Sequence, residues 1–139
     1  MALYATTIFG GACLLFLVQP MIGKFILPWF GGSAGVWTVC MLFFQLLLLA
    51  GYAYAHGVTR WLPARVQAAS QVALLAAAAI SLPITPDETW KPDPEADPTL
   101  RILLLLGASI GVAYFALSTT GPLLQRWYSA LHEIGRAHV

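Results

Sequence analysis

Apolar residues fill four long stretches of this chain, and short polar or glycine- and proline-rich connections separate them. A helix needs about 20 consecutive apolar residues to cross a bilayer. The pattern therefore predicts four membrane-spanning helices, the third of which is near the short limit for a span. They cover about residues 3–27, 36–55, 66–82 and 100–120.

The connection between the first two stretches has the residues of a tight turn. Pro28 predicts the end of the first helix, because proline lacks an N–H donor and clashes with the preceding turn. Gly31 and Gly32 permit backbone angles that other residues rarely adopt. Val36 then begins the second apolar stretch, so this segment predicts a membrane hairpin.

Composition supports a membrane protein, because 59% of the 139 residues are hydrophobic and only 9% are charged. A soluble domain is about a quarter charged. We therefore predict an all-α, polytopic transmembrane helix bundle without a soluble domain, with the lipid bilayer as its surroundings. The net charge of +1 gives no reason to expect binding to nucleic acid.

The basic residues predict the orientation of the spans. The short connection at 57–65 carries Arg60 and Arg65 without an acid, which is typical of a cytoplasmic loop. The acidic, proline-rich loop at 84–99 then lies outside the cytoplasm, and both termini lie inside it. Lys24 and Arg101 oppose this assignment mildly, since both are placed toward the extracytoplasmic ends of spans.

Four polar or helix-breaking residues of the first two spans are candidates for a cavity or for packing. Pro20 predicts a kink in the first span, and Gln19 could bond to a neighbouring helix. Lys24 either extends its ammonium group to the lipid headgroups or faces an aqueous cavity or a partner carboxylate. His56 either caps a helix end or hydrogen-bonds at the interface, or titrates near neutral pH.

The fourth span carries two further candidate features. Gly107 and Gly111, four residues apart, predict a face on which another helix packs closely. A polar, proline-containing segment follows, made of Ser118, Thr119, Thr120, Gly121 and Pro122. Interrupted backbone at membrane depth is tolerated where it lines protein or water. This segment therefore predicts either a cavity-lining element or a simple kink.

Motifs that would indicate catalysis or a cofactor are missing from the sequence. Residues 31–35 match the letters of a nucleophile elbow, but two predicted spans flank them and no acid is placed to orient a histidine. The acids occur only in the 84–99 loop and at Glu133. We therefore expect no catalytic residues, cofactor or metal site in this chain.

Three segments carry a resemblance to a known family. They read LVQPMIGKFILPWFGGSAGVW, GYAYAH and ALSTTGPLLQRWYS. They resemble the N-terminal membrane part of bacterial proteins that fuse major-facilitator-like spans to a spermidine-synthase-like domain. The resemblance covers residues 3–129, and it implies a bundle in the bacterial inner membrane. The loop between the second and third spans departs from the major-facilitator pattern, because it has Gly57 and basic residues but no Asp.

The resemblance implies two alternative functions. The bundle would be a membrane anchor or regulatory unit for a cytoplasmic aminopropyltransferase-like domain that is missing here. Alternatively, it would be part of a major-facilitator-like small-molecule transporter, for instance of a polyamine. A cationic substrate would favour acids inside the spans, and the spans have none, so we favour the anchor.

The end of the chain also departs from the family. Residues 130–139 read ALHEIGRAHV, where the family would pass into another span. We therefore expect a truncated fragment whose last residues could be foreign, and whose partners are further transmembrane helices of a parent chain or of another copy.

Overall fold

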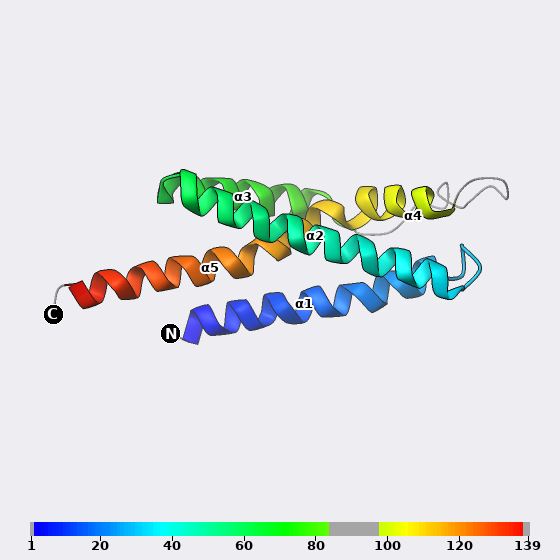
Figure 1. The fold of residues 1–139 in the computed structure, drawn as a ribbon, viewed down its shortest axis with the longest axis horizontal. Coiled ribbons are helices and arrows are strands. Elements are labelled where there is room, and N and C mark those ends of the chain that lie inside the picture. The colour runs from blue at the N-terminus through cyan, green and yellow to red at the C-terminus, as the bar shows by residue number, and fades with distance from the viewer. Residues whose placement is uncertain (1, 84–97, 138–139) are drawn as a thin grey trace.

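The structure is a computed structural model that describes residues 2–83 and 98–137, with side chains described up to residue 131. All regular elements of the described residues are helices (Figure 1). They are α1 (Ala2–Ile26), α2 (Ala34–Trp61), α3 (Ala64–Ile80), α4 (Pro98–Leu106), the π-helical segment η2 (Gly107–Gly111) and α5 (Val112–Ala137).

The lengths of these helices confirm an all-α membrane bundle. In the described ranges, three helical stretches are long and apolar enough to cross a bilayer: α1, α2 and the continuous stretch Pro98–Leu131. Helix α3 is apolar but shorter, and its 17 residues span only about 26 Å at 1.5 Å per residue. No soluble domain is evident in the described part of the chain.

The helix that contains the predicted fourth span is longer than that span. It begins at Pro98 and continues through η2 and α5 to Ala137, so it does not end near residue 120. Pro122 lies inside α5 without ending it, which is common in transmembrane helices because neighbouring groups satisfy the backbone. The regular helix is interrupted earlier, at η2. The acidic loop predicted for 84–99 falls mostly outside the described residues.

The hairpin between α1 and α2 has the predicted geometry. Gly31 and Gly32 have φ angles of +85° and +64°, which only glycine adopts readily. Ser33 caps α2, since its hydroxyl accepts a hydrogen bond of 3.4 Å from the Val36 N–H. A capping hydroxyl satisfies one of the N–H groups that have no partner within the helix.

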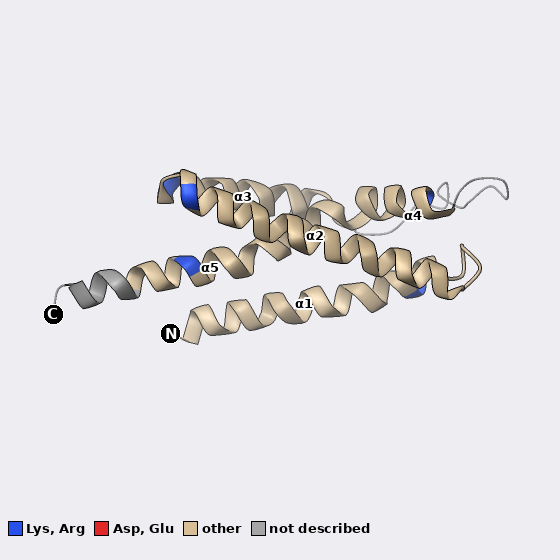
Figure 2. Ribbon diagram, in the orientation of Figure 1, with Lys and Arg blue, Asp and Glu red and all other residues tan. Residues whose placement is uncertain are grey.

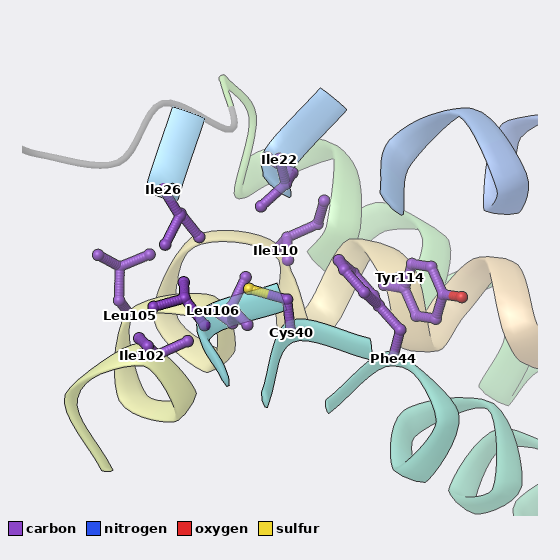
Figure 3. Packing of buried hydrophobic residues seen from close by; sticks show 10 residues of the cluster. Ile22, Ile26, Cys40, Phe44, Ile102, Leu105, Leu106, Ile110 and Tyr114 are labelled. Carbon is purple, nitrogen blue, oxygen red and sulfur yellow. The ribbon is translucent and has the colours of Figure 1, made fainter. Parts of the chain in front are cut away.

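Helix α5 is central to the bundle, because it contacts α1, α2 and α3. The larger of two buried apolar clusters lies beside it, among α1, α2, α4 and η2, and Figure 3 shows these side chains pointing toward one another. Tyr114 of α5 joins this cluster, with its ring centroid 4.8 Å from that of Phe44. A smaller cluster of Ala55, Val58 and Leu123 joins α2 to α5 farther along the bundle.

Close helix approaches occur at two glycines that the sequence analysis did not select. A Cβ atom on Gly51 of α2 would collide with the Ser118 side chain of α5 and lie 3.3 Å from the Ser118 carbonyl carbon. A Cβ atom on Gly23 of α1 would lie 2.6 Å from the Trp37 ring. Small residues let helix backbones approach closely in lipid, and Gly51 does so for the α2–α5 pair.

The face predicted at Gly107 and Gly111 is open among the described residues. A Cβ atom on Gly107 would have no neighbour within 4 Å, and one on Gly111 would only meet the Leu106 carbonyl oxygen at 3.9 Å. Both glycines belong to η2, where the wider π-helical turn changes the face that each residue presents. Within the described ranges, the four-residue spacing therefore does not bring a neighbouring helix onto them.

The described charges lie near the two ends of the bundle (Figure 2). Lys24 is in the last turn of α1 and Arg101 is near the start of α4. Arg60 is in the last turn of α2, while Arg65 is in the first turn of α3. The described side chains include no Asp or Glu, since the six acids are at 87, 88, 93, 95, 97 and 133.

Candidate functional site

A cleft of about 370 Å³ lies between α1, α2 and α5. We call it the central cleft. Its lining residues are Thr7, Ile8, Gly11, Ala12, Leu15, Tyr52, Leu117, Ser118, Thr120, Gly121, Pro122 and Gln125. Four of the five residues of the predicted cavity-lining segment thus line a real cleft. The exception is Thr119, which is buried and turned toward α3.

The hydroxyl groups of the central cleft donate to their own helices. Thr7 donates to the Leu3 carbonyl oxygen at 2.8 Å, and Ser118 donates to that of Phe115 at 2.7 Å. Such back-bonding is common for Ser and Thr in transmembrane helices. The donors left for a ligand are the amide of Gln125 and the phenol of Tyr52, both on exposed residues. The cleft has no charged lining residue, so it suits a neutral or amphiphilic ligand.

A polar contact joins α3 to α5 beside the cleft. The Gln71 side chain donates to the Thr120 hydroxyl at 2.9 Å and accepts from the Thr119 hydroxyl at 3.1 Å. The Thr120 hydroxyl donates in turn to the Ala116 carbonyl oxygen at 2.7 Å. These bonds tie the less apolar helix α3 to α5 at membrane depth.

A second contact along the same two helices involves Gln67. Its side-chain oxygen accepts from the Trp127 indole N–H at 2.7 Å, and its amide donates to the Leu62 carbonyl oxygen at 2.8 Å. Gln67 therefore satisfies both of its polar atoms within the bundle. The indole bond also fixes the orientation of Trp127 near the end of the described part of α5.

The candidates of the first span lie apart from the central cleft. Gln19 donates to the Tyr114 hydroxyl at 2.7 Å, so it binds a neighbouring helix as predicted. Pro20 is exposed and lies inside the unbroken helix α1. Lys24 is exposed near the end of α1, an arrangement that suits an ammonium group at the headgroups. None of the three lines the cleft.

A second hollow, of about 200 Å³, lies beside His56. We call it the basic hollow. It is lined by Tyr52, Ala55, His56, Thr59, Pro122 and Arg126. It shares Tyr52 and Pro122 with the central cleft, so the two cavities adjoin. The place of Arg126 beside His56 follows from the packing of α2 on α5.

The sequence analysis selected Thr119 and Thr120 but missed their partner Gln71 and the pair Gln67 and Trp127, although a spacing signal was present. Gln67 and Gln71 are four residues apart and therefore share one face of a helix. Thr120 and Trp127 are seven residues apart and likewise share a face of α5. A polar face on each helix could have predicted that these helices pair.

Comparisons with known proteins give no relative from which a function could be inferred. No protein-family model matches the chain, and no curated protein or solved structure matches it. The described residues also hold no group of three or more His, Cys, Asp or Glu side chains that could bind a metal ion. The class of this protein, a multi-helix membrane bundle, therefore rests on its own helices.

Proposed function

We propose that this chain is the membrane part of a spermidine-synthase-like fusion protein of the bacterial inner membrane. In this proposal it anchors or regulates a cytoplasmic aminopropyltransferase-like domain that belongs to a longer parent chain. The resemblance of three segments, in residues 17–37, 51–56 and 116–129, supports the proposal. The bundle itself would carry no catalytic residue.

The observation that carries this proposal is the mutual bonding of the polar side chains inside the bundle. Gln19, Gln67 and Gln71 each form a hydrogen bond with a residue of another helix. No buried side-chain nitrogen or oxygen among the described residues lacks a partner. Polar groups that are already paired hold helices together and have little capacity left for a substrate. This pattern favours a structural bundle.

The central cleft favours a second candidate function, as part of a small-molecule transporter. Its volume of about 370 Å³ lies in the range of small-molecule sites, and Tyr52 and Gln125 offer donors. A cationic polyamine would need compensating charge at membrane depth, whereas the lining residues carry none. The cleft therefore gives less support to polyamine transport than to transport of a neutral solute.

We expect the purified 139-residue chain, reconstituted in vesicles, to show neither activity. The assays are aminopropyl transfer from decarboxylated S-adenosylmethionine to putrescine, and saturable polyamine uptake relative to empty vesicles. A soluble fluorescent reporter fused after Val139 should remain in the membrane fraction after carbonate extraction. Aminopropyl transfer or saturable uptake by the chain alone would refute the anchor function, as would release of the reporter.

We expect Arg60 and Arg65 to lie in the cytoplasm, so that both termini are cytoplasmic, because basic residues in short loops are retained inside. The measurement is labelling of single cysteines by an impermeant maleimide in intact cells, after Cys13 and Cys40 have been replaced by alanine. A cysteine at Leu62 should stay unlabelled until the cells are opened, and one at Thr89 should react at once. The reverse pattern would show the opposite orientation.

A further inference from the structure

The basic hollow combines a cationic opening with an adjoining cleft that is partly apolar. Arg126 of α5 and His56 of α2 line the hollow together, although they are 70 positions apart in the sequence. Both side chains are exposed. Tyr52 and Pro122 line both cavities, so a ligand can occupy the hollow and extend into the central cleft.

The helix lengths place the basic hollow at the membrane surface. Arg101 and Arg126 are 25 positions apart on one continuous helical stretch, which separates them by about 37 Å along the axis. The hydrocarbon core is about 30 Å thick, so the two arginines reach opposite interfaces. His56 lies five residues before the end of α2 at Trp61, close to the same interface as Arg126.

The chemistry of the hollow fits a phosphate group. A guanidinium group offers several N–H donors to phosphate oxygens, and the His56 ring can add another. The Thr59 hydroxyl is not counted, because it donates to the carbonyl oxygens of Ala55 and His56. The described side chains include no carboxylate, so no described acid competes for Arg126.

The adjoining part of the central cleft fits an acyl chain. Ile8 and Leu15 of α1 and Leu117 of α5 line it, and a Cβ atom on Gly11 would have no neighbour within 4 Å. Basic pockets between transmembrane helices commonly bind anionic lipid headgroups. A free phosphate would use the hollow but would leave these apolar walls uncovered.

We propose that the basic hollow binds the phosphate of an anionic phospholipid, while one acyl chain of that lipid lies in the central cleft along α1 and α5. The lipid would link α1 to α2 and α5 at the end of the bundle where the described core is smallest. This binding site is independent of the activity of any parent protein, because it needs only groups of this chain.

The test uses the full chain in a neutral detergent, with phosphatidylglycerol or phosphatidylcholine added at equal mole fraction. Native mass spectrometry measures bound lipid, and thermal unfolding measures stabilisation. We expect more phosphatidylglycerol than phosphatidylcholine to bind, and we expect phosphatidylglycerol to raise the unfolding temperature of the protein more. Arg126→Gln should weaken its binding about fivefold, the scale of one basic residue near a membrane surface. Arg65→Gln, with the same charge change outside the hollow, should leave binding unchanged.

A second pair of variants tests the acyl chain. Gly11→Leu should fill the cleft and reduce phosphatidylglycerol binding without destabilising the lipid-free protein, since a Cβ atom at Gly11 has no neighbour within 4 Å and the rest of the side chain enters a cleft of about 370 Å³. Gly10→Leu is the control, because Gly10 is equally open but does not line the cleft.

Three outcomes would overturn the proposal. If Arg126→Gln and Arg65→Gln lose equal amounts of phosphatidylglycerol binding, the lipid is attracted by the net charge at this end of the bundle and not by the basic hollow. Equal stabilisation by glycerol 3-phosphate would indicate a site for a soluble anion. Unchanged lipid binding in Gly11→Leu would show that no acyl chain occupies the cleft. The Gly11 measurement remains decisive if Arg126→Gln fails to fold.

Discussion

Gly51→Ala is expected to destabilise the bundle by about 2 kcal/mol, the middle of the range for overpacking. The new methyl group would collide with the Ser118 side chain and lie 3.3 Å from its carbonyl carbon. Ser118 is 1% exposed, and a change of its side-chain rotamer would not move its backbone away from the new methyl group, so α2 and α5 would have to separate. Thermal or denaturant-induced unfolding in detergent micelles, followed by circular dichroism, measures the change.

Gly10→Ala is the matched control for Gly51. It makes the same substitution within a regular helix, but at a site with no neighbour within 4 Å. Alanine is favoured over glycine in a helix interior by up to about 1 kcal/mol, so this variant should be as stable as the parent or more so. Equal stability of the Gly51→Ala and Gly10→Ala proteins would show that α2 and α5 do not approach closely at this point.

Gln71→Leu is expected to destabilise the bundle by about 1–2 kcal/mol, because interhelical hydrogen bonds in membranes contribute roughly 0.6 kcal/mol each and at most about 1.7. Gln71 bonds to two threonines of α5 and is 5% exposed. Leucine cannot form these bonds, although it is more apolar. The main effect should be weaker packing of α3 against α5. A cysteine placed at the buried residue Ala78 of α3 should therefore be labelled faster in the variant.

Gln45→Leu is the control that shows whether the effect of Gln71→Leu comes from lost hydrogen bonds or from the more apolar side chain. Gln45 lies in the middle of α2 and is exposed, and its side chain forms no hydrogen bond with the described residues. The same substitution should therefore be neutral or slightly stabilising in a lipid-like environment. If Gln45→Leu destabilises the bundle as much as Gln71→Leu does, the hydrogen bonds between α3 and α5 do not have the assigned role.

The class of fold and the hairpin could be predicted from local sequence. Apolar length alone identifies a helix that can cross a bilayer, and the φ angles at Gly31 and Gly32 follow from the turn that these glycines permit. The end of the fourth helix could not be predicted in this way. Pro122 indicates a helix break by its local chemistry, yet α5 continues past it to Ala137.

The candidate site was predicted in part. The segment from Ser118 to Pro122 was selected because its polar groups need protein or water around them, and four of its residues line the central cleft. The packing face predicted at Gly107 and Gly111 is not covered by another helix of the described residues. Residue spacing shows which side chains share a face, but it does not show which helix covers that face.

Local sequence is enough to predict an all-helical membrane bundle, because backbone hydrogen bonding in lipid must be satisfied within each segment and so depends on local apolar length. Which small and polar residues contact one another is visible only in the packed bundle. Gly51 meets Ser118, Gln71 meets Thr120, and His56 lines one hollow with Arg126. These pairs depend on the rotation and register of one helix against another, which distant parts of the chain set together.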